Sequence, residues 1–205
     1  MTNYQTRLTE SEIAAEEYKK LLGGGSQLWS QRGAAQLDFL IHQGLLPGSR
    51  LLDIGCGPLR AGTFFIKFLN QGNYTGFDSN ESFIDAAEKV VAQNRLEHKK
   101  PRIFVARDFQ VEHSCFFDFG IAFSVLNHCK RNERLAFFRN IAAAFRPSAS
   151  IFVSHGRWYK RSYLSDSKLR LQRMITSPLE ARSFDHAWTD YERLSLVFPI
   201  LQFTI

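Results

Sequence analysis

Apolar residues along the chain fall into two patterns, short continuous runs and longer stretches with helical spacing. The short runs are typical of buried strands, and they predict strands at 50–54, 74–77, 102–106, 117–123 and 150–154. The longer stretches, in which apolar residues recur every three or four positions, predict helices at 10–22, 31–43, 59–69, 81–93 and 133–145. Strands that alternate with helices in this way predict an α/β fold, with a mainly parallel sheet covered on both faces.

The last fifty or so residues are less regular. We expect a helix at 165–175, where Leu169, Leu171 and Met174 would dock on the protein, and another at 190–197. The segment 200–205 predicts a final strand.

A glycine-rich turn follows the first expected strand. Gly55 and Gly57 lack a Cβ, so the backbone at these positions can turn sharply and approach a ligand closely. Asp78 ends the second strand at 78 minus 57, or 21, positions beyond Gly57. An acid at about this spacing binds a ribose hydroxyl in nucleotide-binding folds. The pattern therefore predicts a ligand that contains a nucleoside.

Two residues weaken the interpretation as a dinucleotide site. The dinucleotide fingerprint has a third glycine three positions after the second, but Arg60 stands there. Asp53, at the carboxyl end of the first strand, would repel a pyrophosphate. A cationic nucleoside derivative suits this site better, which leaves an NAD-dependent oxidoreductase as a weaker alternative. S-adenosylmethionine has an adenosine for Asp78 and two cationic groups for an electronegative pocket near Asp53.

The segment from about 36 to 154 resembles the class I S-adenosylmethionine-dependent methyltransferases, whose first motif is an acid, any residue, Gly, any residue and Gly after an apolar strand. The resemblance implies a Rossmann-like, doubly wound sheet, with S-adenosylmethionine as cofactor and S-adenosylhomocysteine as product. It also implies a methyltransferase that acts on an unidentified acceptor. The cofactor-binding residues that it implies are Asp53, Gly55, Cys56, Gly57, Asp78, Ser79, Asp108, Phe109 and Ser124.

Within that resemblance the glycine turn, Asp53 and Ser124 would hold the methionine part, and Asp78 the ribose. Asp108 and Phe109 would meet the adenine, although Asp108 could instead only cap a turn. His128 is the candidate general base, because an imidazole accepts a proton near neutral pH. It could also pack locally, since methyl transfer can depend on alignment alone. A catalytically inactive module that binds the adenosyl cofactor, or a regulatory module, is the alternative function.

Members of this family end in an antiparallel strand inserted between the fifth and sixth strands. If 200–205 is the sixth strand, no residues remain for that insertion, so we expect the terminal antiparallel strand to be missing. An open sheet edge would then favour a homo-oligomer.

Length and composition bear on the number of domains, on metal binding and on the cellular location. A chain of 205 residues is within the range of one domain, here an N-terminal helical lid over 1–45, with Trp29 and Gln36 near the crevice, and a cofactor-binding domain over 46–205. Cys56, Cys115 and Cys129 match no zinc spacing, so we expect no metal. Residues 1–20 contain no apolar stretch, which predicts a cytoplasmic protein with no signal peptide or membrane span.

Positive charge is concentrated in one segment. Residues 156–183 contain seven Lys or Arg and two Asp or Glu, which gives +5 of the total net charge of +6. One interpretation is an anionic acceptor, and the other is a solvated helix. The fourth strand ends in Ser124, Val125, Leu126 and Asn127, without the Asn-Pro-Pro-aromatic signature of nucleobase methylation. We therefore expect a small-molecule acceptor rather than a nucleic acid.

Overall fold

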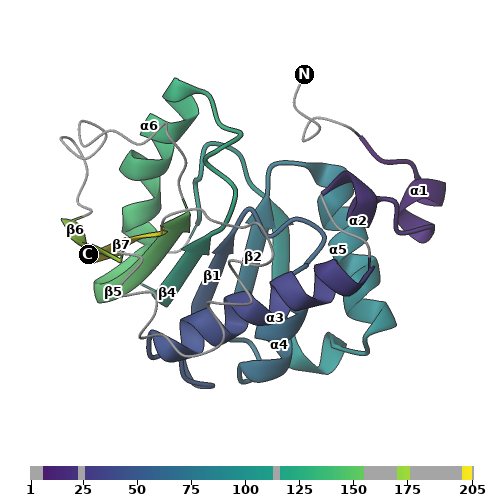
Figure 1. Ribbon diagram of the computed structural model, residues 1–205, viewed down its shortest axis with the longest axis horizontal. Coiled ribbons are helices and arrows are strands. Elements are labelled where there is room, and N and C mark those ends of the chain that lie inside the picture. The colour runs from purple at the N-terminus through teal and green to yellow at the C-terminus, as the bar shows by residue number, and fades with distance from the viewer. Residues whose placement is uncertain (1–6, 23–25, 113–115, 155–169, 176–199, 205) are drawn as a thin grey trace.

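The computed structural model describes residues 7–22, 26–112, 116–154, 170–175 and 200–204. Its centre is a seven-stranded sheet in the order β3-β2-β1-β4-β5-β7-β6 (Figure 1). The strands are β1 (Leu51–Ile54), β2 (Tyr74–Asp78), β3 (Arg102–Val105), β4 (Phe117–Ala122), β5 (Phe145–Ser154), β6 (Arg170–Ile175) and β7 (Ile200–Thr204). The order reverses between β1 and β4, which is where ligands bind in sheets of this kind.

The expected parallel sheet is confirmed, but the expected loss of the terminal antiparallel strand is wrong. Strands β3, β2, β1, β4 and β5 pair in parallel. Strand β7 is antiparallel to both β5 and β6, so it is the inserted strand, and β6 runs in the same direction as β5. The sixth strand comes from 170–175, where a helix was expected. Because β7 is paired on both sides, it offers no open edge, and a homo-oligomer stays a prediction.

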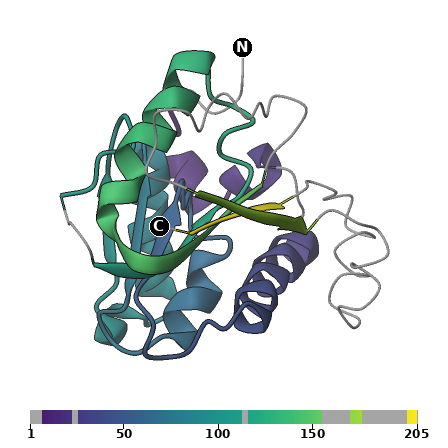
Figure 2. The ribbon, with the colours of Figure 1, turned by 90° about the vertical axis from the view of Figure 1, so that its left-hand side faces the viewer.

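Helices cover both faces of the sheet (Figures 1 and 2). The helices α3, α4 and α5 lie on one face, and α6 lies on the other. The helices are α1 (Glu10–Ala14), α2 (Tyr18–Leu21), α3 (Ser26–His42), α4 (Gly62–Phe68), α5 (Glu81–Gln93) and α6 (Arg131–Asn140), with the 3-10 helices η2 (Glu97–Lys99) and η3 (Ile141–Ala144).

Alternate residues of each strand supply the two halves of the core. In β1, Leu51 packs with the cluster formed by α3, α4 and α5, whereas Leu52 and Ile54 pack with the cluster around α6 and η3. Successive side chains of a strand point to opposite faces, so this pattern places one apolar layer on each side of the sheet. Phenylalanines fill both layers, and Phe65 and Phe137 are each fully buried. Most of the phenylalanines that the structure describes therefore lie in or against the core.

Several expected helices differ from the observed ones: α3 begins at Ser26 rather than at 31, and the segment 141–144 forms η3 instead of continuing α6. The helix expected at 10–22 is interrupted, because Glu16 adopts a left-handed backbone with φ of 55°. The helix expected at 59–69 begins only at Gly62, since Leu59 also has a positive φ, of 59°. A left-handed residue breaks the helical hydrogen-bond ladder, and Leu59 thereby leaves residues 55–61 as the turn between β1 and α4. The helix expected at 190–197 lies outside the described residues.

The N-terminal segment packs directly on the sheet-bearing part of the chain. The Leu8 amide donates a hydrogen bond of 3.1 Å to the Ser82 hydroxyl in α5. Tyr18 and Trp29 belong to the same apolar cluster as α4 and α5. Gly33 brings α3 so close that a Cβ there would lie 2.2 Å from the Arg60 carbonyl oxygen. The described N-terminal helices thus share one core with the sheet, and their movement as a lid stays a prediction.

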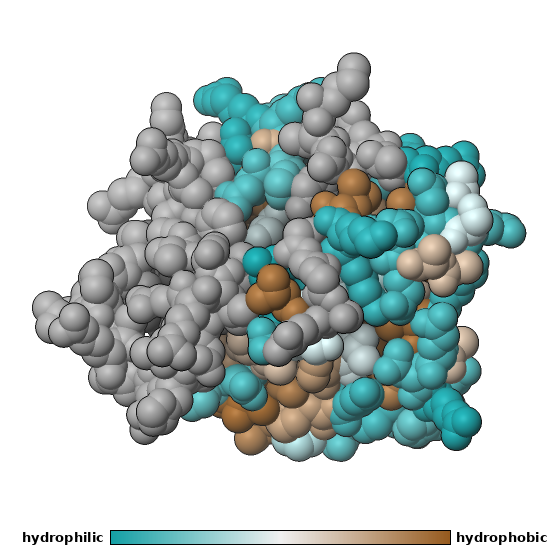
Figure 3. Space-filling view, turned by 45° about the vertical axis from the view of Figure 1, so that its right-hand side comes forward, coloured by the Kyte–Doolittle hydropathy of each residue, from teal (hydrophilic) through white to brown (hydrophobic). Residues whose placement is uncertain are grey.

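On the face that Figure 3 shows, the described residues are mostly hydrophilic, and hydrophobic residues gather along its lower part and in smaller groups above it. The described large apolar side chains that are exposed are Leu28, Ile41, Leu46 and Val105. Scattered exposed apolar residues of this kind are common on folded proteins. Among the described helices, none combines the length and the apolar character that crossing a membrane requires.

Candidate functional site

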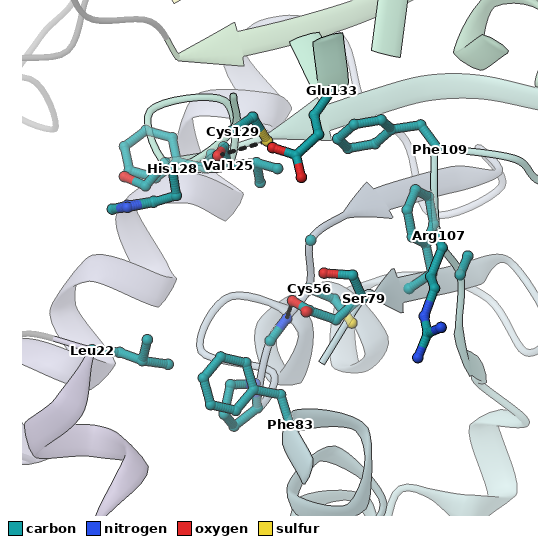
Figure 4. A pocket seen from close by; sticks show the side chains of 18 of the residues that line it. Leu22, Cys56, Ser79, Phe83, Arg107, Phe109, Val125, His128, Cys129 and Glu133 are labelled. Carbon is teal, nitrogen blue, oxygen red and sulfur yellow. Dashed lines mark hydrogen bonds between the residues drawn. The ribbon is translucent and has the colours of Figure 1, made fainter. Parts of the chain in front are cut away.

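A cavity of about 670 Å³ opens at the carboxyl ends of the central strands. Its walls come from residues 55–58 after β1, 77–79 at the end of β2, 106–109 after β3 and 123–125 after β4. Figure 4 shows side chains from these segments around the cavity, with Leu22 and His128 toward one side and Arg107 and Phe109 toward the other. The volume lies within the range of about 300–1,000 Å³ that small-molecule sites have.

The glycine turn forms one wall of the cavity. The amides of Gly55 and Cys56 both donate to the Phe77 carbonyl, at 2.8 and 2.9 Å, which ties the turn to β2. Both glycines have left-handed backbones, with φ of 71° at Gly55 and 52° at Gly57. A Cβ at Gly55 would lie 2.5 Å from Val125, whereas a Cβ at Gly57 would meet no atom within 4 Å. Gly55 therefore permits packing, and Gly57 leaves open space at the cavity.

Asp78 lies beside this turn, as its spacing predicts. Its Oδ2 accepts a hydrogen bond from the Gly57 amide at 3.1 Å, and its Oδ1 accepts one from the Asn80 amide at 2.9 Å. Burial raises the pKa of Asp78, while these backbone hydrogen bonds oppose the shift. Ser79, the next residue, is exposed at the same wall. The carboxylate is thus held rigidly between the turn and α5.

Asp53 does not line the cavity but lies buried behind the glycine turn, with 7% of its surface exposed. Its Oδ2 accepts a hydrogen bond of 2.9 Å from the Tyr74 hydroxyl. Burial raises the pKa of Asp53 to about 7, and the Tyr74 hydrogen bond acts in the opposite direction. Asp53 thus lies one layer behind the cavity wall, and its contact with a ligand stays a prediction. Cys56 separates the two layers, because it is buried and also lines the cavity.

Asp108 and Phe109 form the wall beyond β3. Both residues have left-handed backbones, with φ of 56° and 57°, and this geometry turns the chain back along the cavity. The Asn140 side chain donates to the Asp108 carbonyl at 2.8 Å. The Phe109 ring packs edge-on against Phe137, with 5.2 Å between the ring centres. This wall therefore has a fixed aromatic surface and an exposed carboxylate.

The end of β4 supplies the opposite wall. The Ser124 amide donates to the Ser154 hydroxyl at 2.7 Å, and Ser124 has a positive φ of 57°. His128 is exposed at the cavity, and partial burial lowers its pKa, so the neutral imidazole predominates at neutral pH. Burial raises the pKa of the neighbouring Cys129 thiol to about 12, which keeps that thiol protonated.

These residues fit an adenosyl sulfonium ligand. The open space at Gly57 admits a ligand backbone, the Asp78 carboxylate can accept hydroxyl hydrogens, and the Phe109 wall can contact a flat ring. Among the described residues, no group of three or more His, Cys, Asp or Glu is arranged to hold a metal ion. Cys115 lies outside those residues.

Residues 52–151 match a family model described as a methyltransferase domain. The segment 52–151 is thus identified as a methyltransferase domain. The matched segment runs from β1 into β5, so it contains the four strand ends that surround the cavity. No curated protein matches the sequence of this chain.

Solved structures of methyltransferases are similar to the whole chain. A TehB-like SAM-dependent methyltransferase from Corynebacterium glutamicum has 22% identity and a TM-score of 0.63, with 95% of this chain and 97% of that chain covered. The magnesium protoporphyrin IX methyltransferase from Synechocystis, solved with bound SAM, has 17% identity and a TM-score of 0.63, with 93% and 90% covered. A SAM-dependent methyltransferase from Aquifex aeolicus has 16% identity, a TM-score of 0.61 and 96% and 98% covered. These similarities show the fold, and S-adenosylmethionine is the cofactor of the methyltransferase family.

Several residues that line the cavity were not predicted as site residues from the sequence. Arg60 lines the cavity, with its guanidinium 5.6 Å from the Trp29 ring centre. Leu22 and Trp29 also line it, and of these Trp29 was expected near the crevice. Glu133, from α6, lines the cavity and shows in Figure 4, although it follows no recognisable motif. Gln36, which was also expected near the crevice, is buried within α3 and is not a lining residue.

Proposed function

We propose that this methyltransferase moves a methyl group from S-adenosylmethionine to a small-molecule acceptor that binds in the same cavity. The observation that carries the proposal is one continuous space with two unlike ends. Figure 4 shows Arg107 and Phe109 toward one end of the space, and Leu22 and His128 toward the other. A transferase must hold its two substrates side by side. A cavity of about 670 Å³ offers room for a cofactor and a small acceptor together.

In this proposal the cofactor lies along the carboxyl ends of the strands. Asp78 accepts hydrogen bonds from the ribose hydroxyls, and Asp108 and Phe109 meet the adenine. The methionine part lies at Gly57 and Ser124, on backbone that is already fixed by hydrogen bonds. The buried carboxylate of Asp53 supplies negative charge behind this end, where the sulfonium and ammonium groups would lie.

The acceptor is proposed to be small because of the cavity's shape and charge. The described basic lining residues Arg60, Arg107 and Lys130 are balanced by three acidic ones, which are Asp78, Asp108 and Glu133. Such a balanced lining does not form the positive surface that nucleic-acid backbones require. The basic segment 156–183 lies largely outside the described residues, so an anionic acceptor group is supported by sequence alone.

Methyl transfer requires the protein to align the two substrates and, for a hydroxyl or amine acceptor, to remove a proton. When bound, S-adenosylmethionine supplies an electrophilic methyl group. Leu22 and Trp29 present apolar surface that keeps water from the reacting atoms. Neutral His128 is placed to accept a proton from an acceptor hydroxyl or amine.

Replacing His128 tests its part in the reaction. If His128 removes the proton, His128→Asn lowers kcat about 100-fold and removes the acidic limb of the pH–rate profile, because the amide cannot titrate. The KM for S-adenosylmethionine should stay nearly unchanged, since the imidazole does not hold the cofactor. An unchanged kcat would assign the reaction to alignment alone.

Replacing Asp78 tests the proposed site. Asp78→Ala should weaken S-adenosylmethionine binding in calorimetry about 10- to 100-fold, because it removes charged hydrogen bonds to the ribose. Asp85→Ala is the matched control, since Asp85 is an exposed acid in α5, the helix that follows β2. Equal binding by the two variants would contradict the site.

A screen for S-adenosylhomocysteine formation against acceptor mixtures separates the enzyme from a binding module. The proposal expects at least one small molecule to give turnover above the background without acceptor. Cofactor binding without turnover on any acceptor class would favour the alternative of an inactive adenosyl-binding module.

A further inference from the structure

The buried side of the glycine turn holds a polar cluster that the proposed function leaves unexplained. The Tyr74 hydroxyl donates to Asp53 Oδ2 at 2.9 Å, and the Tyr74 side chain is 2% exposed. Two glycines make the slot that this hydroxyl occupies. A Cβ at Gly62 would lie 2.5 Å from the Tyr74 oxygen, and one at Gly76 would lie 2.7 Å from it. The tyrosine is thus enclosed between β2 and the start of α4, with its hydroxyl directed at Asp53.

One layer of protein separates this cluster from the cavity. Cys56 lines the cavity, and its Sγ lies 3.1 Å from the position of a Cβ on Gly76, beside the Tyr74 hydroxyl. Gly55, at the cavity wall, is two residues after Asp53 on the same strand end. A charge on Asp53 therefore acts on the cavity across a short, water-poor distance, where screening is weak.

We propose that Tyr74 is a positioning residue that favours the carboxylate form of Asp53, so that the site prefers the cationic S-adenosylmethionine over the neutral S-adenosylhomocysteine. The proposal rests on the proposed function, because it places the sulfonium near the glycine turn. A carboxylate attracts a sulfonium but not a thioether, so its charge separates the methyl donor from the product. The hydroxyl hydrogen bond stabilises the carboxylate form, and this opposes the burial that favours the neutral acid.

The other groups around Asp53 set the background for this effect. Asp78 in β2 disfavours its ionisation, and Arg60 in the turn before α4 favours it. Cys56 stays protonated, since burial raises its pKa well above the ordinary value. Tyr74 itself stays protonated for the same reason. The pKa of Asp53, about 7, lies in the physiological range.

The test is the ratio of the dissociation constants of S-adenosylhomocysteine and S-adenosylmethionine, measured by calorimetry on the full chain between pH 6 and pH 8.5. Because the sulfonium lowers the pKa of the amino group of S-adenosylmethionine, the wild-type ratio is compared at each pH with that of Asp53→Asn, and titration of the ligands themselves cancels in this comparison. For the wild type the ratio should rise with pH as Asp53 ionises. For Tyr74→Phe the rise should move to higher pH, with a ratio about five-fold lower at pH 7, since loss of the hydrogen bond shifts the equilibrium by about one pH unit.

Further variants keep the test decisive. Asp53→Asn should give a low ratio without the rise seen in the wild type, and adding Tyr74→Phe to it should change the ratio no further. If Tyr74→Phe does not fold, loss of the rise in Asp53→Asn carries the test, and an Asp53→Asn ratio that rises with pH as the wild-type ratio does overturns the proposal. A Tyr74→Phe protein with the wild-type ratio at every pH, or with equal weakening of both ligands, also overturns it. Failure of the wild type to bind either ligand would instead contradict the proposed function, and the inference with it.

Discussion

Two glycines two positions apart serve the same turn for different physical reasons. Gly55 faces Val125 so closely that any side chain would collide with the end of β4. Gly57 faces open space, and there the left-handed backbone and the approach of a ligand favour glycine. The spacing in the sequence predicts the turn and the nearby Asp78, because a ligand-binding turn of this kind is a local feature. It does not predict that Asp53 lies behind the turn, since that depends on Tyr74 reaching across from β2.

Alanine at each glycine should separate packing from binding. Gly55→Ala should lower the free energy of unfolding by about 2–4 kcal/mol, because a clash adds to the left-handed backbone strain. Gly57→Ala should cost only about 1 kcal/mol, from backbone strain, yet weaken S-adenosylmethionine binding at least as much as Gly55→Ala does. Denaturant unfolding and calorimetry measure the two effects. Equal stability losses for the two variants would contradict this assignment.

Asp53 also makes stability depend on pH in an unusual direction. Its pKa in the folded protein, about 7, lies above the ordinary value of 3.8. The folded state therefore holds a proton that the unfolded chain has released, and this contribution to stability is lost as pH rises from about 4 to 7. Asp53→Asn removes the titration, so its stability relative to the wild type should improve by about 2–3 kcal/mol between pH 5 and pH 8. Unfolding curves at both pH values measure this, and a constant difference would contradict the buried ionisation.

At the scale of elements, the sequence predicted those whose ends and buried face are set by neighbouring residues, and missed those set by distant partners. The helix α5 begins and ends where expected, because the Asn80 side chain caps it, accepting from the Ser82 amide at 3.0 Å, and its apolar residues share one face. The segment 170–175 forms a strand instead of a helix, because it pairs with 200–204, a partner about thirty residues away that no local pattern reveals. The N-terminal residues at the cavity, Leu22 and Trp29, depend likewise on how α3 docks.

The docking of α3 depends on Gly33. A Cβ there would lie 2.2 Å from the Arg60 carbonyl oxygen and 2.7 Å from the Phe64 ring, so Gly33→Ala should force α3 away from the turn before α4. We expect a loss of about 1–3 kcal/mol in the free energy of unfolding, together with weaker cofactor binding, because Trp29 would move from the cavity. Gly48→Ala is the control, since a Cβ at that loop position would meet nothing within 4 Å. A Gly33→Ala protein as stable as the control would contradict this close packing.

At the scale of the whole molecule, the strand order brings together residues that are distant in sequence. Placing β1 beside β4 sets the turn after residue 54 against the segment 123–125, and placing β2 beside β3 brings Asp78 near Asp108 and Phe109. The α/β pattern predicted these five parallel strands. It could not show that 200–204 inserts between β5 and β6, because the strand at 170–175 was itself unrecognised. Family resemblance and physical reasoning thus predicted most of the strand-end residues that line the cavity, whereas Leu22, Arg60 and Glu133 required the structure.

The most direct test of the central claim is a crystal structure of the protein with bound S-adenosylhomocysteine. The account predicts the ribose hydroxyls on Asp78, the adenine at Asp108 and Phe109, and the thioether sulfur at the end of the cavity that faces His128. A ligand bound outside this cavity, or one oriented with its adenine at the His128 end, would contradict the account.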